Sequence, residues 1–156
     1  MKLHLHEVSA EDIPIFFEHL QDPVATHMAA FTPEDPSDLE AHMAHWQKLL
    51  SDDTIIKRSI LLNDELVGHI ASWVQEEERE ITYWIGTDHW GHGVATKALE
   101  VFLTIMRSRP VYARTAADND GSVHVLMNCG FALHDAIRGF ANARGEEIDE
   151  LVYKLG

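Results

Sequence analysis

Cysteine is almost absent from this sequence, since Cys129 is the only one in 156 residues. A single cysteine excludes an internal disulfide framework and a cluster of thiolates around a metal ion, and it favours a reducing compartment. At this length one domain can bury enough apolar surface to fold without cross-links. We therefore expect a single domain, residues 1–156, that is stabilised by its core.

Long apolar runs and basic residues are also scarce. No stretch approaches the ~20 apolar residues of a membrane-spanning helix, and residues 1–6 lack the apolar core of a signal peptide. The 26 Asp and Glu residues outnumber the 12 Lys and Arg residues, which gives a formal net charge of −14. Such a field repels nucleic acid and anionic membranes and attracts cations such as amines, although it also serves plain solubility. We expect a soluble, cytoplasmic protein that binds neither nucleic acid nor membrane.

Two closely spaced glycines, Gly91 and Gly93, stand between a strand-like run and a long amphipathic helix. Residues 80–86 are rich in β-formers, and apolar residues recur at helical spacing after the glycines. Such glycines let successive amides point inward, where the amides and the helix dipole can hold an anion. The sequence lacks the Gly-Lys-Ser/Thr of a P-loop and the third glycine of a dinucleotide fingerprint. Taken alone, the motif is equally compatible with an ordinary strand-to-helix turn.

Four short motifs follow one another at close spacing: Tyr83-Trp84-Ile85-Gly86, Trp90-Gly91-His92-Gly93-Val94-Ala95-Thr96, Asn119-x-x-Ser122 and Cys129-Gly130-Phe131. Together they resemble the GNAT superfamily of acyl-CoA N-acyltransferases. The branch they resemble includes the ribosomal-protein N-terminal (alanine/serine) acetyltransferases. The specific part of the resemblance covers residues 80–131. The commoner loop of the superfamily begins with Arg or Gln where this chain has Trp90, a departure that fits the branch.

The resemblance and the order of elements predict an α+β fold with a mixed, mostly antiparallel sheet of about six to seven strands and about four flanking helices. Strands are expected at residues 3–8, 55–62, 66–74, 80–86, 111–115, 131–138 and 148–155, with turns at 63–65 and 76–78. Helices are expected at 9–20, at 24–50 with a break at Pro33 and Pro36 and a new start capped by Ser37, at 93–106 and at 120–130. The resemblance also implies that strands 80–86 and 111–115 splay apart.

The cofactor that the resemblance implies is acetyl-CoA, acting as a cosubstrate. Its pantetheine arm would contact a main-chain group of Ile85 and the side chains of Asn119 and Ser122, although an Asn at a helix start is also an ordinary cap. Its pyrophosphate would rest on the loop whose members are Trp90, Gly91, His92, Gly93, Val94, Ala95 and Thr96. Trp90 either covers this loop or packs beneath it.

Glu80 is the candidate general base, because the resemblance puts it on the strand that forms the cleft floor. The alternative is a solvated glutamate in an acidic run. Many family members protonate the leaving thiolate with a tyrosine four residues before the Gly-Phe pair, but this chain has Leu126 there. Ser122 is the hydroxyl that remains nearby; otherwise the thiolate leaves unassisted, since its pKa is not far above neutral.

Other reactive side chains fit structural roles better. Cys129 has no basic partner at short spacing, so packing is favoured over nucleophilic catalysis. The 11 histidines do not form the carboxylate-flanked pattern of a zinc enzyme, and we expect no metal. The resemblance implies that the helical region 24–50 forms one wall of the acceptor cleft, with Met28, Phe31, Met43 and Trp46 as candidates, although a core role is favoured for each of them taken singly.

The sequence therefore predicts an acetyl-CoA-dependent N-acetyltransferase that moves an acetyl group to a primary amine by direct attack on the thioester. The acceptor is either a small molecule or a protein N-terminus, and a homodimer is compatible with the chain. A non-catalytic acyl-CoA-binding domain on the same scaffold is the alternative.

Overall fold

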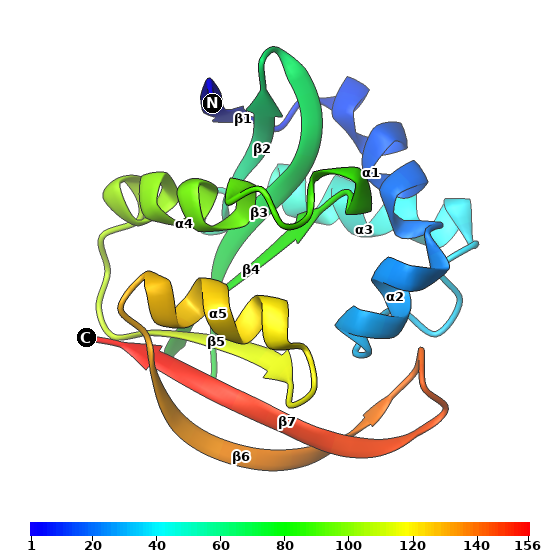
Figure 1. The fold of residues 1–156 in the computed structure, drawn as a ribbon. Helices are drawn as coiled ribbons and strands as arrows, with labels where there is room; N and C mark the ends of the chain where they lie inside the picture. The colour runs from blue at the N-terminus through cyan, green and yellow to red at the C-terminus, as the bar shows by residue number, and fades with distance from the viewer.

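The computed structural model describes residues 1–156 and contains one seven-stranded sheet with helices on both faces (Figure 1). The strands, in chain order, are β1 (Leu3–Glu7), β2 (Ile56–Leu62), β3 (Glu65–Gln75), β4 (Glu78–Ile85), β5 (Val111–Ala116), β6 (Ala132–Ala141) and β7 (Glu146–Leu155). Their order in the sheet is β1-β2-β3-β4-β5-β7-β6, and only β4 and β5 are parallel. This confirms the predicted α+β class with a mixed, mostly antiparallel sheet.

Five α-helices and two short 3-10 turns connect the strands. The helices are α1 (Ile13–Leu20), α2 (Pro23–Ala29), α3 (Leu39–Ser51), α4 (Val94–Ile105) and α5 (Asp120–Asn128), and the 3-10 turns are η1 (Ala10–Asp12) and η2 (Thr87–His89). The region predicted at 24–50 contains two helices separated by the proline-rich segment 30–38, which agrees with the predicted break and new start and makes the α-helices five rather than about four. The helices are too short or too polar for any of them to span a bilayer.

The two faces of the sheet carry separate clusters of buried side chains. On the first face, α4 and α5 pack onto the central strands, and the main core joins Leu99 and Phe102 of α4, Leu126 of α5 and Ile81 of β4. On the second face, α1 and α3 form a smaller aromatic cluster, where the ring of Phe16 lies 4.9 Å from that of Trp46. The central strands are therefore covered on both faces, but by different helices.

Two tight hairpins start the strands earlier than predicted. The loops consist of Asn63-Asp64 and Glu76-Glu77, and all four residues have positive φ between 50° and 70°. Two-residue loops of this kind match the twist of the flanking strands. The turns are therefore one residue shorter than the predicted 63–65 and 76–78, and β4 already begins at Glu78.

Two further boundaries differ from the prediction. The cap of α3 is Asp38, whose carboxylate accepts from the amide of Ala41 at 3.0 Å, while the predicted cap Ser37 donates to Asp35 instead. An Asp and a Ser are both good caps, so their order in the sequence could not decide between them. Strands β6 and β7 are also longer than predicted, because they pair with each other along almost their whole length.

The parallel pair β4–β5 is joined only at its start. Arg79 lies opposite Val111 and Glu80 opposite Tyr112, and no later residues of the two strands pair. From there the strands diverge, as the sequence predicted, and Thr82 is exposed although it belongs to a central strand. The open part of the sheet is called the splay below.

Histidines surround the aromatic cluster, and the burial of one of them, His69, should lower the stability of the fold in acid. His69 lies 4.7 Å from the ring of Phe16, and its buried Nδ1 has no hydrogen-bond partner. Burial, together with the positive charges of His19, His42 and His45, lowers the pKa of His69 from 6.5 to about 3. The unfolded chain then binds this proton more readily than the folded chain, so stability decreases as the pH falls below 6.5 toward 3.

We therefore expect the free energy of unfolding to fall by about 1–2 kcal/mol between pH 7.5 and pH 5 through His69. Chemical denaturation at both pH values measures this difference. The variant His69→Gln should show a flatter pH dependence, whereas His4→Gln, at an exposed site on β1, should retain that of the wild type. Equal pH dependence in wild type and His69→Gln would contradict the assignment.

Candidate active site

The glycine loop leads directly into the start of α4. Gly91 and Gly93 have φ values of 77° and 75°, and no heavy atom outside the adjoining residues lies within 4 Å of where their Cβ atoms would be. Gly93 is the N-cap of α4, and no side chain caps this end. The first amides of a helix have no partner inside it, so the donors at Val94, Ala95 and Thr96 remain available for an anion.

Trp90 connects this loop to the end of β4. Its indole Nε1 donates a hydrogen bond to the carbonyl of Ile85 at 2.8 Å, while the side chain remains 40% exposed. The bond fixes the path of η2 between the strand and the glycines. It uses one of the two lone pairs of the Ile85 carbonyl oxygen.

Glu80 is buried at the closed end of the splay, with 6% of its surface exposed. It is therefore not the solvated glutamate that the acidic run allowed. Arg114 of β5 donates from Nε to Glu80 Oε1 at 2.9 Å, which is the only side-chain bond to this carboxylate. The ion pair bridges the two strands next to their last paired residues.

Arg114 and Glu150 belong to the site but were missed in the sequence. Arg114 Nη1 lies 3.8 Å from Glu150 Oε1 of β7, so one guanidinium lies between two carboxylates. Burial raises the pKa of Glu150, which Arg114 partly offsets and the negative charge of Glu80 reinforces. The signal that could have revealed Arg114 is its position as the only charged residue in the otherwise buried strand β5.

These three charged residues lie on the second face of the sheet, opposite α4 and α5. Glu80 alternates with Ile81, whose side chain packs in the core under α4. Arg114 shares its face with Ala116, which packs against Ala30 just after α2. A cation that approaches from this face therefore meets carboxylates, while the uncapped start of α4 belongs to the other face.

Asn119 caps α5, as the simpler interpretation of its position predicted. Its Oδ1 accepts from the amide of Ser122 at 3.2 Å, and its Nδ2 donates to the carbonyl of Met28 in α2 at 3.3 Å. The side chain thus joins the start of α5 to α2. Loss of the hydrogen bond to Met28 would weaken the contact between these two helices.

Ser122 lies next to Tyr83, a member of the first motif for which no role in the site was predicted. The hydroxyl groups of Tyr83 and Ser122 are 3.0 Å apart. Burial raises the pKa of Tyr83 to about 12, although the hydrogen bond to Ser122 acts in the opposite direction. Tyr83 belongs to β4 beyond the last pair with β5, so the two hydroxyls meet inside the splay.

The four candidates for the acceptor wall divide into two groups. Trp46 and Met43 are in the aromatic cluster between α1 and α3, which is the core role that was favoured for each of them. Phe31 lies beside the second face, because its ring would be 3.3 Å from a Cβ at Gly139 of β6. The carbonyl of Met28 reaches α5 through Asn119, so Met28 and Phe31 are the two that remain near the splay.

Arg144 attaches the loop between β6 and β7 to α2, and its set of contacts is called the Arg144 clamp below. Arg144 donates to both carboxylate oxygens of Asp118 at 2.8 and 3.0 Å and to the carbonyl of His27 in α2 at 2.7 Å. A cavity of about 230 Å³ lies beside this clamp. Segments from both ends of the chain therefore form this side of the cleft.

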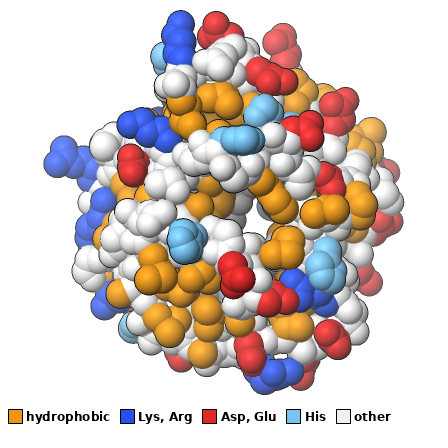
Figure 2. All heavy atoms as spheres, viewed as in Figure 1, with side chains coloured by type: hydrophobic (Ala, Val, Ile, Leu, Met, Phe, Trp, Pro, Cys, Tyr) orange, Lys and Arg blue, Asp and Glu red, His pale blue; other side chains and the backbone are white.

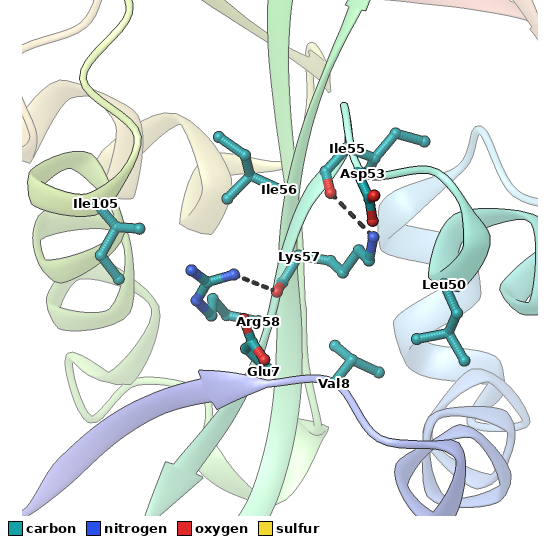
Figure 3. A pocket seen from close by; sticks show the side chains of 9 residues that line it. All are labelled: Glu7, Val8, Leu50, Asp53, Ile55, Ile56, Lys57, Arg58 and Ile105. Atoms are coloured by element: carbon teal, nitrogen blue, oxygen red, sulfur yellow. Dashed lines mark hydrogen bonds between the residues drawn. The ribbon is translucent and has the colours of Figure 1, made fainter.

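The hollow at the splay is visible from outside. Figure 2 shows an opening near the centre of the view, in the region where β4 and β5 diverge in Figure 1, and the exposure of Thr82 agrees with it. A cavity of about 460 Å³ lies elsewhere, between β1, β2 and the ends of α3 and α4 (Figure 3). It touches α4 at Ile105, the end opposite the glycine loop, and contains none of the predicted site residues.

Two other predictions concern reactive groups. Burial raises the pKa of Cys129 to about 11, and its thiol lies 3.6 Å from the carbonyl of Thr96, which supports packing rather than a nucleophilic role. No group of three or more His, Cys, Asp or Glu side chains is arranged to hold a metal ion.

Comparison with known proteins identifies the family. Residues 2–132 match the family described as Acetyltransferase (GNAT) domain. The chain belongs to the GNAT acetyltransferases. This confirms the resemblance found in the sequence and, at the level of the family, the prediction of an N-acetyltransferase.

Individual relatives are distant but cover the whole chain. The "Uncharacterized N-acetyltransferase p20" of Bacillus licheniformis is 24% identical over 164 residues, covering 99% of this chain and 92% of that protein. The ribosomal L7/L12 α-N-protein acetyltransferase RimL, solved with coenzyme A, has a TM-score of 0.86 at 18% identity, covering 99% of this chain and 94% of that one. The spermidine N-acetyltransferase of Vibrio cholerae, solved with CoA and spermine, has a TM-score of 0.79 at 17% identity, covering 97% and 95%. At these identities the two structures establish the shared fold.

The glycine loop predicts a matched pair of substitutions. Gly93→Val should weaken CoA binding by at least about 10-fold, because the side chain projects among the amides proposed for the phosphates and strains a left-handed residue. Gly145→Val is the control: Gly145 has a φ of 65°, equally open surroundings and a place in the β6–β7 loop. It should cost similar stability and leave the affinity unchanged. Calorimetric titration with CoA compares them, and equal affinities would remove the phosphate site from this loop.

Proposed function

We propose that this chain is an acetyl-CoA-dependent N-acetyltransferase that moves an acetyl group to a primary amine by direct attack on the thioester. The observation that carries the proposal is the splay. An uncapped helix start lies at its mouth, carboxylates line one face and a pair of hydroxyls lies within it. An acyl donor and an amine can therefore approach the same gap from opposite faces of the sheet.

CoA would be held by the loop that contains Trp90, Gly91, His92, Gly93, Val94, Ala95 and Thr96, together with Ile85, Asn119 and Ser122. Backbone amides and the helix dipole suit the pyrophosphate, because they supply positive potential without a bound cation. The bound thioester would supply the electrophilic carbonyl carbon. CoA in the solved RimL and spermidine acetyltransferase structures supports this cosubstrate.

The acceptor would be cationic before it reacts. Two carboxylates, Glu80 and Glu150, flank the single guanidinium of Arg114, so the local charge is negative, like the whole chain. Such a site attracts an ammonium group. A protein N-terminus, as acetylated by RimL, and a small polyamine, as acetylated by the Vibrio cholerae enzyme, both fit this chemistry.

In the proposed reaction Glu80 acts as the general base. Arg114 fixes its Oε1, while Oε2 has no bonded partner and can accept the proton of the attacking amine. The C–N bond forms, the C–S bond breaks, and the electron pair of the C–S bond remains on sulfur. Ser122, as the second proposed catalytic residue, would donate a hydrogen bond to the departing thiolate.

We further propose that residues 1–156 act as one domain in the reducing environment of the cytoplasm. All seven strands belong to one sheet, and Cys129 is a free thiol. The rival function is a non-catalytic acyl-CoA-binding domain, which would bind CoA without turnover. A panel of amines assayed with acetyl-CoA and a thiol-detecting reagent distinguishes the two, since only an enzyme releases CoA in response to an amine.

Glu80→Gln tests the base directly. The substitution keeps the shape of the side chain but removes its charge and basicity, so turnover should fall by about 10²-fold and the acidic limb of the pH–rate profile should flatten or move. If Glu80 only attracts the amine, the loss should appear mainly as a higher KM.

The matched control for this test is Glu147→Gln. Glu147 is exposed on β7 and points to the opposite face from Glu150, so this change removes one charge without touching the site. Its kinetics should equal those of the wild type. Thermal melts of both variants separate a loss of the Arg114 ion pair from a loss of chemistry. Wild-type rates in Glu80→Gln would exclude it as the base.

A further inference from the structure

Tyr83 spans the splay from β4 and reaches the first turn of α5. It is three residues beyond Glu80, the last residue of β4 that pairs with β5, and its hydroxyl lies 3.0 Å from that of Ser122. The ring packs against the main core under α4 and α5. Tyr83 is thus the side chain of β4 that contacts the helix carrying the proposed thiolate donor.

The direction of this hydrogen bond decides what Ser122 can do. A serine hydroxyl has one proton and two lone pairs, and its proton rotates to suit its surroundings. If Tyr83 donates to Ser122 Oγ, the proton of Ser122 is free to point toward a second acceptor. If Ser122 donates to Tyr83 instead, its proton already has an acceptor inside the protein and cannot also be donated to a second acceptor.

The surroundings of the Tyr83 hydroxyl favour the first direction. The buried phenol is protonated at working pH, and its proton needs an acceptor inside the protein. Its hydroxyl has Ser122 as its only hydrogen-bond partner in the protein. The amide of Ser122 is already directed to Asn119 Oδ1 at 3.2 Å, which fixes the backbone that carries this serine.

We propose that Tyr83 is a positioning residue that orients the hydroxyl of Ser122 toward the sulfur of the departing CoA. The inference rests on the proposed acetyl transfer and adds a second residue to its leaving-group side. As the C–S bond breaks, the electron pair remains on sulfur, and the thiolate accepts a hydrogen bond from Ser122, whose oxygen accepts one from Tyr83. No proton leaves Tyr83; the amine proton passes to Glu80, and the thiolate takes its proton from water after release.

This arrangement compensates for a missing group. Leu126 occupies the helix position at which a tyrosine would otherwise reach the thiolate, and its side chain is fully buried in the core. A polarised serine hydroxyl stabilises developing charge better than an isolated one, because each hydrogen bond in a chain strengthens the next. The hydroxyls of Tyr83 and Ser122 would then together take the role that one tyrosine has in many family members.

A double-mutant cycle on single-turnover rates tests the coupling. Tyr83→Phe removes only the hydroxyl and should lower the rate by about 10-fold, whereas Ser122→Ala should lower it by about 10- to 100-fold. In the Ser122→Ala background, Tyr83→Phe should have no further effect, since its proposed work passes through Ser122. The affinity of Tyr83→Phe for CoA should remain within about threefold of the wild type.

Tyr153→Phe is the matched control. Tyr153 is a buried tyrosine in the same core, on β7, and its hydroxyl has no side-chain partner. It should have wild-type rates. Thermal melts of every variant establish that each is folded.

Two results would overturn the inference. One is a wild-type rate in Tyr83→Phe. The other is an equal fractional loss from Tyr83→Phe in both backgrounds, which would give Tyr83 a purely structural role. A wild type that binds CoA but acetylates none of the amines, or that does not bind CoA, would instead refute the proposed function. The two failures are therefore distinguishable.

Discussion

The structure depends on the early parting of β4 and β5. Backbone amides and carbonyls that are not paired in a sheet must find other partners or face solvent, so an opening in the middle of a sheet is unfavourable unless its surroundings hold it. Here α4 and α5 pack across the first face, and the Glu80–Arg114 ion pair ties the strands where they separate. These contacts within the chain therefore hold the opening in place.

The charges beside this opening have a structural and an electrostatic effect. A partly buried ion pair adds little net stability, because desolvation offsets much of the attraction. Its value lies in geometry: Arg114 holds one oxygen of Glu80 and approaches Glu150, so both carboxylates keep fixed positions on the second face. The excess of one negative charge in this row sets the sign of the potential that an incoming group meets.

Local patterns predicted the frame of the molecule better than its long-range contacts. The paired glycines, the β-rich run before them and the cap at Asn119 are short-range signals, and each predicted the element that the structure contains. Arg114, Glu150 and Tyr83 were missed because their roles arise from contacts with residues 34 to 39 positions away in the chain. Alternation along a strand can suggest which face a residue is on, but it cannot name the partner. The prediction of Ser37 as the cap of α3, where the structure has Asp38, was wrong for a similar reason. When two adjacent residues are both good caps, only tertiary packing decides which of them caps the helix.

The Arg144 clamp joins two segments that lie far apart in the sequence. The elements proposed for CoA come from one continuous stretch, from β4 to α5, whereas the opposite wall joins α2, near the beginning of the chain, to the β6–β7 hairpin at its end. The family match ends at residue 132, so almost all of that hairpin lies outside it. Substitutions in these two segments can therefore change the shape of the wall proposed for the acceptor without altering the residues proposed for CoA.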